Sequence, residues 1–182
     1  PSMRMAWFAA SCTIMLIVLV VVSGCDGVGR EATIGSMHAC FAPHEDCRSA
    51  FVSLVSNATD VSCAFYDLED ELLMRALERV GASVVMDDGA VEDVPGNLVV
   101  ASDSDRALMH NKFCVLDGKV VVTGSLNPTS RGFGRNDNNL LLIHSPLLAR
   151  AYQKEYEELA SGMFGGGSRK VSEDIAVDGG SV

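Results

Sequence analysis

The sequence predicts an α/β domain with a mixed, largely parallel β-sheet flanked by helices. Compact apolar runs at 61–66 and 83–86 are too short for helices and are bounded by turn residues, which is typical of buried strands. An amphipathic segment, 67–80, separates them, and this strand–helix–strand order indicates parallel strands covered by helices. The 182 residues, 48% of them hydrophobic, suffice for one domain with a substantial core and an N-terminal appendage.

The N-terminal residues 1–31 are expected to form a targeting or anchoring segment and a linker. Arg4 precedes a nearly uncharged apolar run, 5–24, which fits a signal peptide and is long enough to cross a membrane. Small residues before Cys25 resemble the lipobox of bacterial lipoproteins, so lipidation of Cys25 is favoured over an uncleaved anchor helix or a cleaved signal. We therefore expect a membrane-associated protein on the extracytoplasmic side of the cell envelope, although the flanking charges are too few to fix the orientation.

The folded domain is expected over residues 32–164, followed by a flexible tail, 165–182. Turn residues, helix caps and apolar periodicity define its elements. In chain order these are strand 33–40, helix 47–56, strand 61–66, helix 67–80, strands 83–86, 98–100, 110–116, 120–123 and 139–143, and a helix from Ser145-Pro146 to about 159.

Four potential metal ligands lie close together near the start of the domain: His38, Cys40, His44 and Cys47. Their spacing fits no standard zinc finger, and the apparent export favours a Cys40–Cys47 disulfide. Free thiols and a zinc site are the alternatives.

The segment with the clearest chemical signature begins at His110-Asn111-Lys112 and runs to Asp117, and a second apolar run then leads to Gly124-Ser125-Leu126-Asn127. Residues i and i+2 of a strand point to the same face, so His110 and Lys112 are expected side by side. Phosphodiester cleavage needs a nucleophile, a proton donor for the leaving alkoxide and groups that stabilise the phosphate oxygens. The segment offers suitable residues and predicts a phosphate site.

The pattern His110-x-Lys112-(x)4-Asp117-(x)6-Gly124-Ser125-x-Asn127 resembles the HKD motif of the phospholipase D superfamily. The short single-motif layout is most similar to the small endonuclease-like branch of that superfamily, and the resemblance covers roughly residues 33–164. It implies a phospholipase D-like α/β/α sandwich and a phosphodiesterase that acts through a phosphohistidine, without a metal or other cofactor.

The resemblance also implies roles for the motif residues. His110 would be the nucleophile, and Lys112 would supply fixed charge to the nonbridging oxygens. Ser125 and Asn127, at the start of a helix that Pro128 helps define, would donate hydrogen bonds to the same oxygens. Asp117 would orient and charge-balance a motif histidine, in this chain or across a dimer.

One position departs from the pattern of the small nucleases, which tend to carry a Glu where this chain has Asn138. In the relatives that Glu hydrogen-bonds the nucleophilic histidine. An amide can orient an imidazole without offsetting its charge, so either Asp137 takes the place or His110 is tuned differently.

A single histidine cannot easily attack phosphorus on one side and protonate the leaving group on the other. Two-motif relatives use a second histidine for the latter, so the chain is expected to form a homodimer with a shared site. The alternative is a second motif beyond Val182.

The substrate is the least determined part of the prediction. A net charge of −10 disfavours a surface coated in nonspecific nucleic-acid contacts and leaves room for a local basic groove, for which Arg131 and Arg135 are the candidates, unless they are simply solvated. We expect an endonuclease, with a phospholipid headgroup hydrolase or a catalytically silent phosphate-binding module as alternatives.

Three further sets of residues are assigned to structure rather than chemistry. They are the loop acids Asp103 and Asp105, expected to be solvated, the core thiols Cys63 and Cys114, expected to be inert, and the packing pair Tyr152 and Tyr156.

Overall fold

The computed structural model describes residues 35–91, 94–103 and 108–165. The chain divides into units 1–30 and 31–182, and the described residues all belong to the second. The elements are β1 (Ser36–Ala42), α1 (Cys47–Asn57), β2 (Val61–Phe65), α2 (Glu71–Val80), β3 (Ser83–Asp87), the 3-10 helix η1 (Asp88–Ala90), β4 (Val99–Asp103), β5 (Lys112–Leu116), β6 (Val120–Gly124), α3 (Ser130–Gly134), β7 (Asn138–His144) and α4 (Pro146–Ala160).

The strands form one seven-stranded sheet in the order β1-β7-β6-β5-β2-β3-β4. The mixed sheet with flanking helices is confirmed, and β2–α2–β3 is the expected parallel unit. The expectation of a largely parallel sheet is wrong, because only β2–β3 and β3–β4 are parallel and the other four neighbouring pairs are antiparallel. Two of these antiparallel pairs, β5–β6 and β6–β7, join consecutive strands. The connections, a short turn and the segment that contains α3, are short enough to return the chain directly beside the preceding strand.

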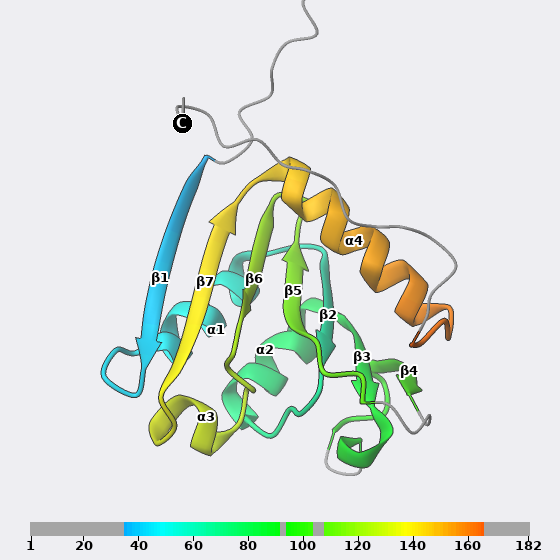
Figure 1. Cartoon of the computed structure of the whole chain (residues 1–182), viewed down its shortest axis with the longest axis horizontal. Coiled ribbons are helices and arrows are strands. Elements are labelled where there is room, and N and C mark those ends of the chain that lie inside the picture. The colour runs from blue at the N-terminus through cyan, green and yellow to red at the C-terminus, as the bar shows by residue number, and fades with distance from the viewer. Residues whose placement is uncertain (1–34, 92–93, 104–107, 166–182) are drawn as a thin grey trace, which may run out of the picture. The chain divides into compact units, whose positions relative to one another are not determined.

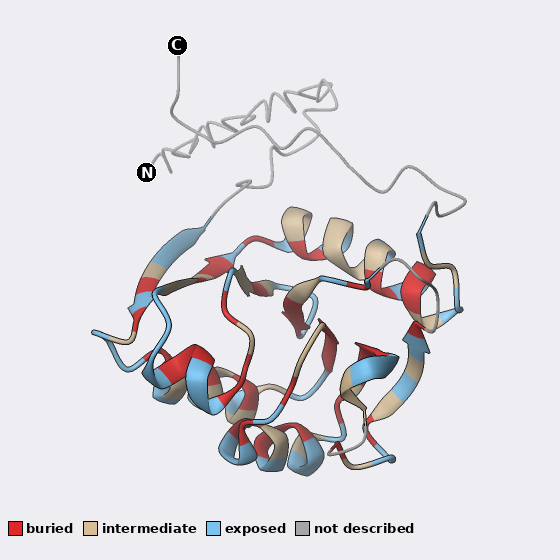
Figure 2. Cartoon of the chain, turned by 60° about the horizontal axis from the view of Figure 1, so that its bottom comes forward, coloured by how far each residue is buried: buried red, intermediate tan, exposed pale blue. Residues whose placement is uncertain are grey.

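Helices cover both faces of the sheet (Figure 1). One core cluster joins α1 and α2 to the sheet through residues such as Phe51, Leu73 and Leu77, and a second joins α4 to the opposite face through Ala149 and Leu159. The strands of the sheet centre appear as buried segments between these layers (Figure 2). The sheet is therefore packed against helices on both faces, which restrains its strands.

Local sequence signals explain the helix ends. Asp70 caps α2 by accepting a hydrogen bond from the Leu73 N–H at 3.1 Å, and Gly81 ends it in the left-handed conformation at φ 66°. Ser145 caps α4 at the Leu148 N–H, with Pro146 in the first turn. Helix α2 begins later than predicted, since residues 67–70 form the loop and cap before it.

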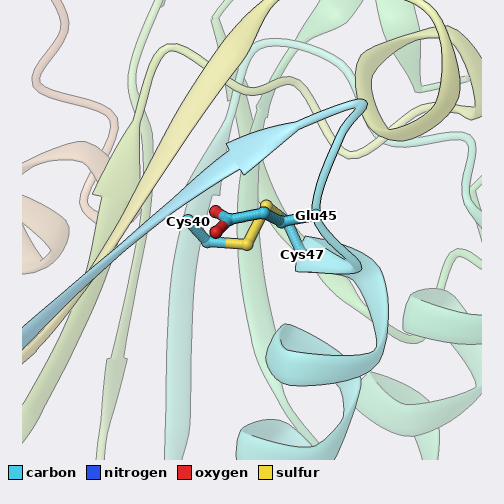
Figure 3. Close-up of side chains that lie close together, drawn as sticks. All are labelled: Cys40, Glu45 and Cys47. Carbon is cyan, nitrogen blue, oxygen red and sulfur yellow. A yellow bond between two sulfur atoms is a disulfide. The ribbon is translucent and has the colours of Figure 1, made fainter.

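A disulfide joins Cys40 at the end of β1 to Cys47 at the start of α1 (Figure 3), with a Cα–Cα distance of 5.7 Å. Of the three alternatives raised by the sequence, this is the one found in the structure. Glu45 lies beside the sulfur atoms, and its carboxylate accepts a hydrogen bond from the Phe41 N–H at 2.6 Å. Sulfurs bonded to each other are not thiolate ligands for zinc.

The expectation that Cys63 and Cys114 are separate core thiols is wrong. They lie directly opposite each other in the antiparallel pair β2–β5, with Cα atoms 4.1 Å apart, and are joined by a disulfide. Both are fully buried. The bond therefore fastens together the two strands that lead to the motif segment.

Of the other structural assignments, the one for Tyr152 and Tyr156 is confirmed and the one for Asp103 is wrong. Tyr152 packs edge-on against Phe113 at 4.9 Å between ring centroids, and Tyr156 is buried, so the packing prediction is confirmed. Asp103 is not solvated: it ends β4 and is only 3% exposed.

The predicted N-terminal anchor, Cys25, Asp105 and nearly all of the predicted tail lie outside the described residues. No helix of the described part of the chain has the length and apolar character needed to cross a membrane.

Candidate active site

The ends of β2 and β6 lie beside the starts of β5 and β7 at one end of the sheet's central strands (Figure 1), and all the motif residues except Asp117 come from these strand ends and the loops next to them. The register of the antiparallel pairs creates this meeting point: Phe65 lies opposite Lys112, Phe113 opposite Thr123, and Gly124 opposite Leu140. Segments far apart in sequence thus place their polar side chains around one end of the central strands.

His110 lies just before β5, not within a strand as expected, and its side chain is exposed. Backbone hydrogen bonds fix the segment on both sides. Met109 donates its N–H to the buried Asp87 carboxylate at 3.1 Å, and Asn111 accepts from the Tyr66 N–H at 2.9 Å. The pairing with β2 ends at this Asn111 bond, because the next backbone group, the Met109 N–H, bonds Asp87 at the end of β3. His110 is therefore exposed on a backbone that is held on both sides.

Lys112 is the cation next to this histidine. Its ammonium donates a hydrogen bond to the His110 carbonyl at 2.9 Å and lies 5.2 Å from the centroid of the Tyr66 ring. Burial lowers the pKa of Lys112, while the carboxylate of Asp67 opposes that shift. The partly buried position strengthens electrostatic interactions with an anion.

Asp67 belongs to the site, although the sequence did not single it out. Burial raises the pKa of Asp67, and the nearby Glu69 raises it further, whereas Lys112 lowers it. A pocket of about 270 Å³ lies on this side of the site, and it is lined by Tyr66, Asp67, Leu68, Glu69, Asp87, Gly89 and Ala90. The surroundings of Lys112 are therefore partly acidic.

Ser125 follows the end of β6 and is held by the start of β7. Its hydroxyl donates to the Asn138 side-chain oxygen at 3.0 Å and accepts from the Asn139 N–H at 3.1 Å. The Asn138 amide also donates to the Gly132 carbonyl at 3.1 Å. In this chain Asn138 thus positions Ser125 and not the imidazole of His110, which is a different task from the one expected of it.

The Gly124-Ser-Leu-Asn127 loop depends on close backbone approach. A Cβ atom on Gly124, which has φ 153°, would overlap the Asn139 carbonyl, and one on Gly132 would overlap the Asn127 carbonyl. The Pro128 carbonyl accepts hydrogen bonds from the N–H groups of Glu69 and Asp70, at 3.0 and 2.9 Å. The loop is therefore fastened to the β2–α2 loop.

Asn127 lies in this loop, and its side-chain oxygen is buried without a hydrogen-bond partner among the described residues. The expectation that a helix starts here is wrong, since α3 begins only at Ser130, with Thr129 as its cap, and is five residues long. The reason is that the Pro128 carbonyl bonds the β2–α2 loop, and Thr129 is extended and caps α3.

Asp117 lies at the opposite end of β5. One of its carboxylate oxygens accepts from the Thr59 N–H and hydroxyl, both at 2.9 Å, and from the Asp60 N–H at 3.0 Å. These donors hold the pKa of Asp117 below its usual range. The five-residue strand separates it by roughly 16 Å from the His110 end, so it does not orient His110 within this chain.

Arg131 and Arg135 are exposed on α3 and at its end. Neither forms an ion pair with another described residue. They are downstream of the Ser125 loop, which leaves their part in substrate guidance a prediction. Asp137, the alternative partner for His110, is also exposed.

Tyr66 is the second residue that the sequence did not single out. Its ring lies 4.7 Å from the His110 imidazole, centroid to centroid, at an interplanar angle of 54°. The sequence shows an aromatic residue at the end of a buried strand, but nothing in it says that β2 and β5 are neighbours.

A mixed α/β/α sandwich with an exposed histidine, a lysine and a serine–asparagine loop at one end of its central strands defines a protein class that handles phosphodiesters. Residues 52–160 match the family described as cardiolipin synthase, PLD-like domain. The chain is 31% identical over 147 residues to a mitochondrial cardiolipin hydrolase of Xenopus laevis, covering 71% of this chain and 70% of that protein. It is 26% identical over 140 residues to a phospholipase D of Rickettsia prowazekii, covering 69% and 68%.

The fold is also that of a solved relative. Nuc, a phospholipase D family member from Salmonella typhimurium, superposes with a TM-score of 0.63 at 20% identity, over 69% of this chain and 94% of Nuc. The chain belongs to the phospholipase D superfamily, as its motif predicts. It is a phosphodiesterase of that superfamily.

Proposed function

We propose that this phosphodiesterase is a metal-independent endonuclease that cleaves nucleic-acid phosphodiesters through a phosphohistidine on His110. The observation that supports the proposal best is the exposed imidazole of His110 at the end of the sheet's central strands, next to Lys112. A polymer passing across that end of the sheet presents its phosphates without having to enter a closed cavity.

The reaction divides the work among the motif residues. An imidazole nitrogen of His110 attacks phosphorus, the bond to the leaving oxygen breaks, and that oxygen takes a proton from a general acid. Water then attacks the phosphohistidine and gives a proton to the group that acted as general acid, and the bond between phosphorus and His110 breaks to release the second product. Lys112 would stabilise the nonbridging oxygens and the Asn127 amide would donate a hydrogen bond to them. The Ser125 hydroxyl would join them by exchanging its hydrogen bond to Asn138 for one to phosphate.

The general acid is assigned to His110 of a second copy. The described part of the chain brings one histidine to the site, whereas attack and protonation occur on opposite sides of phosphorus. A homodimer with a twofold axis through the site supplies two copies of each motif residue. Arg131 and Arg135 would then flank the entry of an anionic strand from either side.

Attachment to a membrane on the extracytoplasmic side, through lipidated Cys25 or an anchor helix, remains part of the proposal. The two disulfides support it, because such bonds persist mainly in oxidising compartments.

A phospholipid headgroup hydrolase is the second candidate. The pocket beside Tyr66 is lined by Asp67, Glu69 and Asp87, and its acids repel a polyanion. Two relatives, a cardiolipin hydrolase and a phospholipase D, favour the same candidate.

The test compares substrates in the presence of EDTA. The full chain is incubated with supercoiled plasmid, single-stranded RNA, cardiolipin vesicles and phosphatidylcholine vesicles. We expect nicking or RNA cleavage by the wild type and by His144→Ala, which alters an exposed histidine at the other end of β7, and none by His110→Ala. Headgroup release without nucleic-acid cleavage would replace the first candidate by the second. Metal-dependent activity, or activity retained by His110→Ala, would contradict both.

A further inference from the structure

The aromatic ring of Tyr66 lies against two motif residues, His110 and Lys112. It lies 4.7 Å from the His110 imidazole and 5.2 Å from the Lys112 ammonium. Tyr66 is the first residue after β2 and is partly buried, so its ring forms a wall of the site.

The position of that ring is set by the backbone. The Tyr66 N–H donates to the Asn111 carbonyl at 2.9 Å, between His110 and Lys112 in the chain. One residue earlier Phe65 pairs with Lys112, and the Cys63–Cys114 disulfide joins the same two strands. Tyr66 therefore cannot shift along β5 without breaking the strand pair.

The imidazole of His110 has no hydrogen-bond partner within the described part of the chain. Asn138, where a carboxylate partner was expected by resemblance, is occupied by Ser125 and by the Gly132 carbonyl. Among the described residues, the ring contact with Tyr66 is therefore the interaction that can restrain the His110 imidazole.

We propose that Tyr66 is the positioning residue of the site: its ring sets the plane of the His110 imidazole and holds the Lys112 ammonium, in place of an acidic partner for the histidine. Ring-to-ring contact restrains the imidazole without using either nitrogen. Both nitrogens then remain free, one to attack phosphorus and the other to exchange its proton with solvent or a partner chain. The ring face also attracts the ammonium, which keeps Lys112 beside the reacting group.

This role depends on the ring and not on the hydroxyl, because both contacts are made by the ring. It rests on the proposed use of His110 as nucleophile. Misplacing a reacting group by about 1 Å costs up to roughly 100-fold in rate, so loss of the ring should be visible in turnover.

The experiment compares Tyr66→Phe with Tyr66→Leu, using bis(4-nitrophenyl) phosphate as substrate in EDTA. We expect Tyr66→Phe to stay within about twofold of the wild type, and Tyr66→Leu to lose roughly 10- to 100-fold in kcat with KM changed less than about threefold. Tyr152→Leu is the matched control, since Tyr152 is a partly buried tyrosine that packs on Phe113 in the same strand and touches neither His110 nor Lys112.

A second measurement does not depend on activity. In a carbon–proton NMR correlation of the imidazole, the ring-current shift of the His110 protons should persist in Tyr66→Phe and Tyr152→Leu and disappear in Tyr66→Leu. The proposal is overturned if Tyr66→Leu keeps the shift, if it keeps its kcat, or if Tyr66→Phe loses as much kcat as Tyr66→Leu. An inactive wild type with the expected NMR pattern would contradict the proposed function while leaving the contact established.

Discussion

The two ends of β5 carry the two halves of one sequence motif, and they are built in opposite ways. At the start, His110 is exposed, and within the described part of the chain its imidazole makes a ring contact with Tyr66 and no hydrogen bond. At the end, a single oxygen of Asp117 accepts three hydrogen bonds from Thr59 and Asp60. The imidazole nitrogens of His110 make no hydrogen bond to the described residues, whereas the Asp117 carboxylate accepts three.

This difference separates chemistry from architecture within the motif. A group that must bond to phosphorus needs an unoccupied nitrogen, whereas a group that fixes a turn is most effective when its acceptors are in use. Asp117 adopts a left-handed backbone, φ 52°, between β5 and β6 and ties that turn to the segment before β2. The histidine, lysine and serine at the other end are then the reactive part of the motif.

The largest expected effect is at the histidine. His110→Ala should lower kcat by about 10⁴-fold or more, since removal of a nucleophile disables the whole catalytic set. Its free energy of unfolding should change by less than about 0.5 kcal/mol, because the side chain is exposed. Steady-state kinetics and urea unfolding measure the two quantities. A stability loss equal to that of a core substitution would break the distinction between the two ends.

Two glycines sharpen the same comparison through stability. Gly124→Ala should cost about 2–3 kcal/mol, because its Cβ would press on the Asn139 carbonyl at the site end. Gly118→Ala, at the turn end, has open space and a left-handed φ of 61°, so only about 1 kcal/mol is expected. Urea unfolding of both variants gives the comparison. Equal losses would mean that the close approach at Gly124 can relax.

Much of the fold could be predicted because its signals are local. The cap and stop of α2, Asp70 and Gly81, and the Ser145-Pro146 start of α4 depend on residues within one turn of each helix. The motif itself is compact in sequence, which is why His110, Lys112 and Ser125 could be assigned to one site before the strand order was known.

The remaining features depend on which strands become neighbours. Cys63 and Cys114 are 51 positions apart, and their pairing follows from the adjacency of β2 and β5, which no local pattern encodes. The same adjacency places Tyr66 against His110. The partners of Asp117 within this chain, Thr59 and Asp60, could not be predicted for a related reason, since they come from the segment that precedes β2.

A smaller effect is expected at the turn end. Asp117→Asn keeps a residue that tolerates the left-handed backbone but removes the charge, so about 1 kcal/mol of stability should be lost at neutral pH, after allowance for solvent exposure. The folded state holds the pKa of Asp117 below 3.8, so its contribution is present above that value and disappears as pH falls through the folded pKa. Unfolding of wild type and variant should therefore converge at low pH, and kcat at neutral pH should stay within about threefold of wild type. A difference in stability that persists at the acid limit would rule out the charge as its source.

The smallest expected effect concerns the charge on Lys112. Burial lowers the pKa of this ammonium below 10.5, so activity should fall on the alkaline side earlier than for an exposed lysine. Asp67 raises the pKa of Lys112, and Asp67→Asn should therefore move the alkaline limb of the kcat profile to lower pH, with about a twofold loss of activity on that limb. Asp117→Asn, which removes a carboxylate at the far end of the same strand, is the matched control and should leave the limb in place. A limb displaced equally by both variants would mean that net charge, and not the Asp67–Lys112 contact, governs the site, and the two ends of β5 would then be electrostatically alike.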